Sequence, residues 1–502
     1  MSSRDPERFL ATGHLHGALK DRSIRGGTVI LFSQAAKFLI STAGTVVLAR
    51  LLAPSDFGLV GMVAALTGVI ATLGYLGLSS ATIQRQDLTH DQVSTLFWIN
   101  VGVGTVMSSL VAACGPAVAY FYRDPRLVGI TLVSSLSFLL GGLASQHYAL
   151  LTRQMRFGAM ALVQSGSALL AMIVAVAMAL HGFGYWSLVV SGVLQAAGLA
   201  LFSWVSIGWK PGRPRKGCGV RSLLAFGGHL TGYNLLTYVT RNADNVLIGR
   251  YLGAAPLGIY SKAYGILMLP VQQINAPVNG VLLPALSRLQ DQPEAYRRYF
   301  LRAIEIVALI GMPIVIFAFA DARLVILTLL GPKWMGAVEI FRLLAPAAAV
   351  GTISMAPGWI FTSLGMAERQ SRWAVLSSPV ILGGFLLGLH WGVAGVAASF
   401  SATYSLTFLF FLADASRRSP VHLRDVAYAF IPAFIASAVA AAVIRTVAEL
   451  PLARSLAHGS HPAQLGIDCI LFALVFVGAS QLFPAGRRVR VVMSRSLRLH
   501  LG

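Results

Sequence analysis

Long apolar stretches recur along the whole chain, and their length decides what it can fold into. A helix that crosses a bilayer needs about 20 consecutive apolar residues. We find fourteen such stretches, each too long for a strand of a membrane barrel and without the alternation of one. Only 11% of the 502 residues are charged, against roughly 25% in soluble proteins. The sequence therefore predicts an all-α polytopic membrane protein with about fourteen transmembrane helices, and it excludes a soluble enzyme.

Basic segments divide these stretches into groups. The first 26 residues are polar, so we expect a cytoplasmic tail and no cleavable signal peptide. The predicted organisation is a cytoplasmic N-terminal tail (1–26), a six-helix N-lobe (27–208), a basic cytoplasmic linker (209–221), a six-helix C-lobe (222–414), two additional helices (426–484) and a basic cytoplasmic tail (485–502).

The positive charge of the chain follows the predicted topology. A formal net charge of +21 suggests nucleic acid at first sight. In a polytopic protein, however, Lys and Arg accumulate in cytoplasmic loops. With the N-terminal tail inside, the inside segments hold 27 basic residues and the outside loops hold eight. We therefore predict a multi-pass protein with both termini in the cytoplasm, surrounded by membrane lipids and without a nucleic-acid partner.

An internal repeat is visible at an offset of 200 residues. The segment from Arg50 to Gly58 (RLLAPSDFG) aligns with the segment from Arg250 to Gly258 (RYLGAAPLG), and Gly27 aligns with Gly227. Any two helices rich in Leu and Gly look somewhat alike, which is the alternative explanation. Matching positions within matching six-helix blocks favour a true repeat. Such a repeat predicts two lobes related by a pseudo-twofold axis along the membrane normal, with the substrate path between them.

Motifs for catalysis or cofactor binding are missing from the sequence. There is no GxxxxGK[ST] and no HExxH, and the three cysteines lie far apart without a CxxC pair. The predicted outer loops are mostly shorter than about 20 residues, which leaves little room for a catalytic domain. We therefore expect no enzyme activity, no cofactor and no metal site.

Four basic residues fall within predicted spans and need an explanation: Lys37, Arg241, Lys262 and Arg342. A Lys or Arg near mid-bilayer costs roughly 2.5–3.5 kcal/mol when it faces lipid, so these residues should face a watery cavity or a partner. Arg241 has Asp244 three residues away and Arg342 has Glu339, so a structural ion pair is the alternative explanation for each. Lys262 lies close enough to a predicted helix end to snorkel. Lys37 has no acidic residue one turn away.

Polar residues at helical spacing accompany these charges. Gln34, Lys37 and Ser41 form a stripe on the first span, and Asn234, Arg241 and Asn245 form one on the seventh. Guanidinium, ammonium and amide groups suit a solute with pyrophosphate and sugar hydroxyls. We predict that a cationic inter-lobe cavity binds such a solute through eight residues: Gln34, Lys37, Ser41, Asn234, Arg241, Asn245, Lys262 and Asn275.

Several segments together resemble a known family. They are residues 47–58 (VLARLLAPSDFG), 151–157 (LTRQMRF), 182–188 (GFGYWSL), 248–253 (IGRYLG), 257–264 (LGIYSKAY) and 283–289 (LPALSRL). The chain is similar over about residues 25–415 to Wzx-type polysaccharide flippases of the colanic-acid-exporter kind, within the multidrug/oligosaccharidyl-lipid/polysaccharide (MOP) superfamily.

The resemblance implies a two-lobed carrier of the bacterial inner membrane. Such carriers move undecaprenyl-pyrophosphate-linked oligosaccharide units by alternating access for exopolysaccharide, capsule or O-antigen synthesis, and a polysaccharide polymerase and export machinery act next. Two alternatives stay open. A cation-coupled multidrug antiporter of the same superfamily typically needs a carboxylate inside a lobe, and only Asp244 is placed so. A membrane polysaccharide polymerase or ligase needs a long outer loop.

Overall fold

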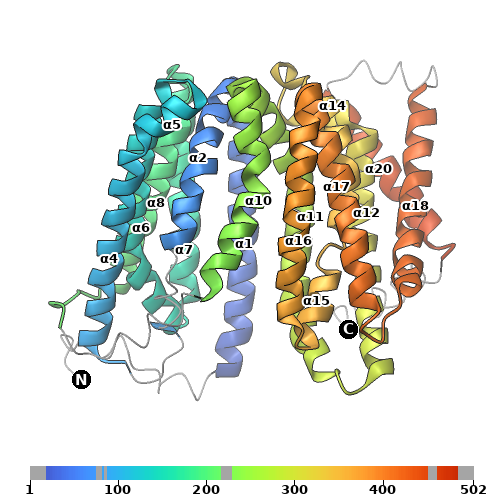
Figure 1. Cartoon of the computed structure of the whole chain (residues 1–502), viewed down its shortest axis with the longest axis horizontal. Helices are drawn as coiled ribbons and strands as arrows, with labels where there is room; N and C mark the ends of the chain where they lie inside the picture. Colours follow the sequence, from blue (N-terminus) through green and yellow to red (C-terminus); the bar gives the residue numbers. More distant parts are fainter. Residues whose placement is uncertain (1–18, 75–81, 84–87, 216–228, 450–460, 484–502) are drawn as a thin grey trace. The chain divides into compact units, whose positions relative to one another are not determined.

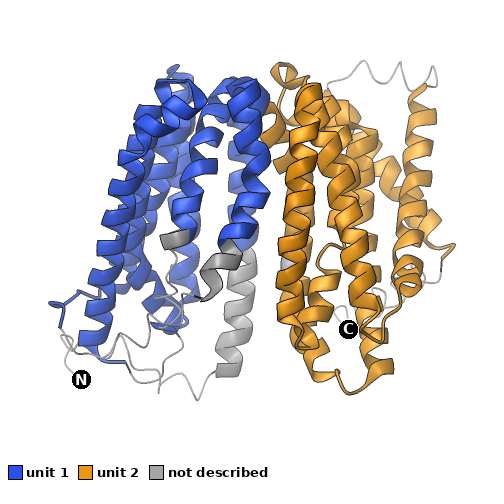
Figure 2. Cartoon of the chain, viewed as in Figure 1, with its two compact units in different colours: residues 1–258 blue, residues 259–502 orange. Residues whose placement is uncertain are grey.

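The computed structural model describes residues 19–74, 82–83, 88–215, 229–449 and 461–483, and within them all regular secondary structure is helical. This confirms the all-α prediction for the described part of the chain. The helices fall into two compact units, residues 1–258 and 259–502 (Figure 2).

The first unit contains eight helices in its described part, in the chain order shown in Figure 1: α1 (Leu19–Leu51), α2 (Pro54–Gly74), α4 (His90–Ala113), α5 (Gly115–Tyr122), α6 (Arg126–Arg153), α7 (Phe157–Leu180), α8 (Trp186–Ile207) and α10 (His229–Leu252). Helix α4 packs on α6, α6 and α7 pack on α8, α1 lies against α7, and α10 lies against α2. The start of α4 is fixed by a capping box, in which Thr89 and Gln92 exchange hydrogen bonds of 3.1 and 3.3 Å.

The second unit begins within α11 and continues to the end of the described chain. Its helices are α11 (Ala254–Arg288), α12 (Pro293–Ala320), α13 (Ala322–Leu329), α14 (Ala337–Gly351), α15 (Ala356–Ser363), α16 (Ala367–Gly388), α17 (Gly392–Ser416), α18 (Leu423–Glu449) and α20 (His461–Ser480), with short 3-10 turns at Pro332–Trp334 and Leu389–Trp391. Helix α12 packs against α14 and α18 over a core that includes Tyr296, Phe300 and Trp359.

Eleven segments of the described chain are long and apolar enough to cross a membrane. One of them, Ala367–Ser416, contains both α16 and α17, whereas α1 and α10 are helical but fall outside the eleven. Large apolar side chains such as Ile173 and Leu387 are 57% and 65% exposed, as expected of surfaces that face lipid. The prediction of fourteen spans in two symmetric lobes remains a prediction.

The aligned glycines of the repeat pack against each other's helix. A Cβ built on Gly58 overlaps the carbonyl of Ala254, and one built on Gly258 overlaps the carbonyl of Pro54. Because 254 and 258 are 54 and 58 shifted by 200, the contact between the starts of α2 and α11 is reciprocal. Only residues without a Cβ permit so close an approach of the two backbones. This local contact has the symmetry that the repeat offset predicts.

Candidate functional site

The polar stripe of α1 lies beside the face that packs on α7. Ser33 Oγ, on the packed face, lies 3.5 Å from Ser165 Oγ of α7. Gln34 and Ser41 are exposed and Lys37 is half-buried. Within the described residues, these three side chains make no hydrogen bond or ion pair. The ammonium group of Lys37 is therefore not neutralised by a carboxylate of the described chain.

Helix α10 carries the second stripe, and Tyr238, which lies on this stripe between Asn234 and Arg241, fixes the helix in place. The hydroxyl of Tyr238 donates to the carbonyl oxygen of Ala64 in α2, at 3.0 Å. Arg241 is exposed and makes no ion pair within the described chain, so the pairing with Asp244 considered from the sequence is wrong. Asn245 keeps a buried Oδ1 without a hydrogen-bond partner in the described part. The side chain of Asn234 lies outside the described residues.

The basic residues of the second unit differ from each other in environment. Lys262 is half-buried on α11. It lies in the sequence midway between Tyr260 and Tyr264, whose rings stack 6.2 Å apart on the other side of the helix. Arg342 is exposed on α14, and no ion pair joins it to Glu339 in the described chain. The pairing of Arg342 with Glu339 that the i−3 spacing suggested is therefore wrong. Both side chains are exposed.

Asn275 of α11 supports a break in the eighth apolar segment of the described chain. Helix α14 ends at Gly351 and α15 begins at Ala356. Between them, turn-type bonds such as that from Ser354 N–H to the carbonyl oxygen of Gly351, at 3.3 Å, replace the regular helical pattern. Asn275 is 4% exposed, and its Nδ2 donates to the carbonyl oxygen of Gly351 at 3.2 Å. One turn further along α11, Asn279 Oδ1 accepts from Trp359 Nε1 of α15 at 2.9 Å. The two amides thus hold both halves of the broken segment.

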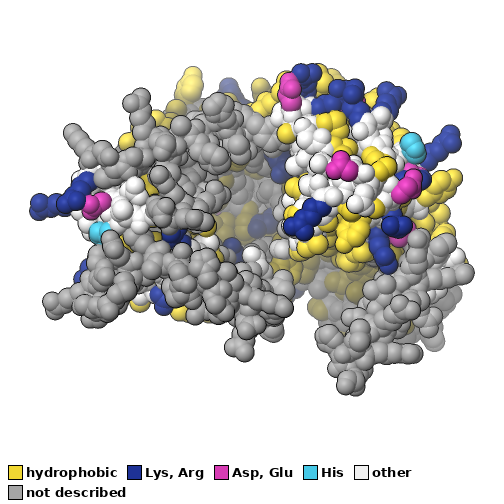
Figure 3. Space-filling model, turned by 90° about the horizontal axis from the view of Figure 1, so that it is seen from below, with side chains coloured by type: hydrophobic (Ala, Val, Ile, Leu, Met, Phe, Trp, Pro, Cys, Tyr) yellow, Lys and Arg dark blue, Asp and Glu magenta, His cyan; other side chains and the backbone are white. Residues whose placement is uncertain are grey.

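Ion pairs gather at one end of the second unit. Arg297 of α12 donates to Asp425 of α18 at 2.6 and 2.9 Å, and Arg369 of α16 donates to Asp414 of α17 at 2.7 and 3.0 Å. Figure 3 shows this end with Lys and Arg side chains around a few acidic ones. Sequence reasoning missed these pairs, since their members are 128 and 45 residues apart. The i,i+4 pairs of Asp414 with Arg418 and of Glu368 with Arg372 do leave a signal in the sequence.

A second charge cluster was also missed. Arg445 of α18 donates to the carbonyl oxygen of Ala320 at the end of α12. Asp321, the next residue, keeps a buried Oδ2 with no hydrogen-bond partner in the described chain. Asp468 of α20 lies close enough to interact electrostatically with both residues. These contacts attach the last two helices to α12.

The described acidic residues of the first unit that precede α10 lie at helix ends. Asp56 accepts from the backbone N–H of Ala53 at 2.9 Å, and Asp91 is paired with Arg215 at 2.6 Å. Arg126 donates to Asp124 in the loop before α6, which holds the pKa of that carboxyl below its usual value. Asp87 lies outside the described residues. These carboxylates have structural partners, whereas Lys37 and Arg241 do not.

The comparisons with known proteins agree with the resemblance seen in the sequence. The family model described as "Polysaccharide biosynthesis protein" matches residues 47–339. The teichuronic acid biosynthesis protein TuaB of Bacillus subtilis is 28% identical over 303 residues, 59% of this chain and 62% of that protein, so the match spans less than two thirds of its length. WzxC, a lipopolysaccharide biosynthesis protein of Escherichia coli, is 24% identical over 76% of this chain and 78% of its own length. ExoT, a succinoglycan biosynthesis transport protein of Rhizobium meliloti, is 27% identical over 71% and 72%.

Two solved structures share the fold. The lipid II flippase MurJ, in an inward closed conformation, has a TM-score of 0.70 at 12% identity over 92% of this chain and 98% of its own. An inward-facing multidrug MATE transporter of the MOP superfamily has a TM-score of 0.58 at 14% identity, over 76% and 94%. The fold is therefore that of flippases and transporters, and the relatives act in polysaccharide biosynthesis.

Proposed function

We propose that this chain, which belongs to the polysaccharide biosynthesis protein family, moves undecaprenyl-pyrophosphate-linked oligosaccharide units across the bacterial inner membrane. The units supply exopolysaccharide, capsule or O-antigen synthesis. Transport proceeds by alternating access through a cationic cavity, without chemistry on the substrate. The family match, the transport role printed for ExoT and the flippase fold of MurJ support this proposal.

The observation that carries the substrate class is the pair of unneutralised cations in the first unit. Lys37 and Arg241 lie in helices and make no ion pair within the described chain. A pyrophosphate brings the negative charge that two such groups attract, and the exposed amide of Gln34 and hydroxyl of Ser41 suit sugar hydroxyls. Asn245 has an unused amide oxygen for the same purpose. Lys262 adds a third cation to the proposed set, which Asn234 and Asn275 complete.

The same observation weighs against a cation-coupled multidrug antiporter. A cavity with excess positive charge repels a cationic drug, and the described carboxylates of helices α2 to α8 bind to helix ends or Arg side chains. A polymerase or ligase is disfavoured by the transport names and folds of the relatives. The proposed partners are the lipid-linked oligosaccharide, membrane lipids, and a polysaccharide polymerase with its export machinery.

Deletion of the gene tests this function. We expect lipid-linked oligosaccharide to accumulate at the cytoplasmic face of inverted membrane vesicles, together with loss of surface polysaccharide. Complementation with the wild-type chain should restore both. Surface polysaccharide lost without accumulation of the lipid-linked unit would instead indicate a defect before transport, and would contradict a flippase.

A further inference from the structure

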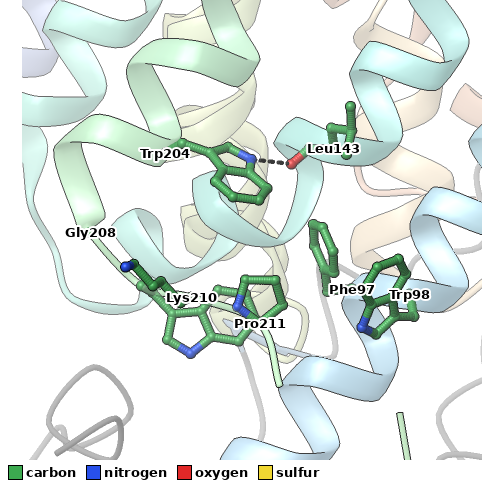
Figure 4. A pocket seen from close by; sticks show the side chains of 8 residues that line it. Phe97, Trp98, Leu143, Trp204, Gly208, Lys210 and Pro211 are labelled. Carbon is green, nitrogen blue, oxygen red and sulfur yellow. Dashed lines mark hydrogen bonds between the residues drawn. The ribbon is translucent and has the colours of Figure 1, made fainter. Parts of the chain in front are cut away.

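The first unit holds an apolar pocket that the proposed transport does not use. Its volume is about 480 Å³, and its walls come from α4, α6, α8 and the segment after α8: Phe97, Trp98, Leu143, Trp204, Gly208, Trp209, Lys210 and Pro211 (Figure 4). Trp204 Nε1 is satisfied by the carbonyl oxygen of Leu143 at 2.9 Å, and Trp98 Nε1 by that of Gly212 at 2.9 Å. The indole N–H groups of both residues are therefore occupied, and their rings offer apolar surface to a ligand.

The pocket lies at the end of apolar surfaces that are exposed along two helices. On α4, Trp98, Val106 and Leu110 follow one another at multiples of four residues and are 45%, 59% and 46% exposed. On α8, Leu201 and Val205 are 58% and 74% exposed. Such stripes on a membrane protein face acyl chains. The ligand that reaches the pocket along these stripes is thus a lipid.

Positive charge is held at the mouth of the pocket. The segment from Gly208 to Arg215 is fixed to the start of α4, because Gly212 N–H donates to Ser94 Oγ at 2.9 Å and Arg215 pairs with Asp91 at 2.6 Å. Arg215 thereby neutralises Asp91. Lys210, which lines the pocket, and Arg213 are exposed and make no ion pair in the described chain. Lys210 is therefore an unpaired cation at the mouth, and Arg213 is a second one three residues further along the same segment.

We propose that this pocket binds an anionic glycerophospholipid of the cytoplasmic leaflet. One acyl chain enters the space between Phe97, Trp98 and Trp204, and the phosphate lies against Lys210 and Arg213. Basic residues at the inner ends of transmembrane helices attract anionic head groups in this way. The occupant is a resident membrane lipid and not the transported unit, so the inference does not depend on the proposed function.

The test measures lipid binding to the purified full-length protein by native mass spectrometry. Dioleoyl phosphatidylglycerol should bind wild-type protein more tightly than dioleoyl phosphatidylcholine. The double variant Lys210→Ala/Arg213→Ala should bind phosphatidylglycerol about tenfold more weakly, since each basic residue near a head group contributes a several-fold preference. Lys210→Arg should retain wild-type binding, which separates charge from folding.

A matched control removes two exposed cations elsewhere. Arg417 and Arg424 of the second unit are exposed and unpaired within the described chain, and Arg417→Ala/Arg424→Ala should leave the binding constant unchanged. Equal loss in both double variants would overturn the site, because it would show only a net-charge effect. If glycerol phosphate alone displaced phosphatidylglycerol, the acyl chain would have no role in binding, and the proposal would be wrong. Tighter binding of undecaprenyl phosphate than of phosphatidylglycerol at the same residues would assign the pocket to the carrier lipid and overturn the proposal.

Discussion

Among single residues, Lys37 makes the sharpest prediction, since it is an unpaired, half-buried cation near the middle of α1. In a cavity of intermediate dielectric, one such charge attracts a pyrophosphate by about 2 kcal/mol. Lys37→Ala should therefore cut surface polysaccharide roughly tenfold at near-normal protein abundance, and Lys37→Arg should retain part of the activity. Quantitative glycan staining beside immunoblotting of membranes measures both quantities.

Arg342 supplies the control for Lys37 on a different helix. It is exposed and not paired with Glu339 within the described chain, so Arg342→Ala breaks no ion pair and should leave abundance unchanged. Full surface polysaccharide from Lys37→Ala at normal abundance would show that Lys37 is a tolerated snorkelling residue.

The contact between the starts of α2 and α11 depends on two glycines, Gly58 and Gly258. A methyl group at either position overlaps backbone atoms, which no side-chain rotation relieves. Gly258→Ala should lower the free energy of unfolding of the purified protein by about 1–3 kcal/mol or more, since that range is usual for overpacking, and should therefore lower its melting temperature. The reciprocal variant Gly58→Ala should have a similar effect. Gly141→Ala on α6 is the control, because a Cβ at this position meets no atom within 4 Å. Equal melting temperatures for all three variants would refute the close contact.

At the break between α14 and α15, the carbonyl oxygen of Gly351 accepts from Asn275 as well as from the backbone N–H and the hydroxyl of Ser354. Asn275→Leu removes the hydrogen bond to Gly351 and should cost about 0.6–1.7 kcal/mol, the range for interhelical hydrogen bonds in membranes. Gln272 is exposed on the same helix, so Gln272→Leu should leave the melting temperature unchanged. If Asn275→Leu instead abolished transport with unchanged melting, its main role would be substrate contact.

Whether a feature of the fold or of the candidate site could be predicted from the sequence depends on how far apart its residues lie along the chain. Local patterns predicted the helices, because about twenty consecutive apolar residues can satisfy their backbone hydrogen bonds in a bilayer only as a helix. The repeat offset aligned Gly58 with Gly258, but it did not predict that each would contact the other's helix. The polar stripes on α1 and α10 were also visible as i,i+3 and i,i+4 spacings. The spacing rule failed for Arg342 and Glu339, because an i−3 spacing brings two side chains to the same face of a helix without requiring them to pair.

Long-range partners could not be predicted. The hydrogen bond from Asn275 to Gly351 joins residues 76 positions apart, and no local pattern showed that α14 would end at Gly351 or which side chain would bind there. The pocket at Trp98 and Lys210 likewise joins residues more than 100 positions apart in the chain. Its members look like an ordinary aromatic belt when each is taken alone.

For the whole molecule, the prediction concerns orientation in the membrane. In the second unit, the ion pairs Arg297–Asp425 and Arg369–Asp414 bring the α11–α12, α15–α16 and α17–α18 connections to one end, which is also rich in basic residues. By the positive-inside rule we predict that this end is cytoplasmic. Reporter fusions at Gly212, Arg418 and Arg495 should therefore read cytoplasmic, and a fusion near Pro332 should read periplasmic. An even number of spans before the linker gives both lobes the same orientation. The fusion at Gly212 is therefore the most informative, because it reports whether that number is even. A periplasmic reading there would change the parity of the first block and remove the six-plus-six arrangement, while a periplasmic reading at Arg418 alone would place the error in the second block.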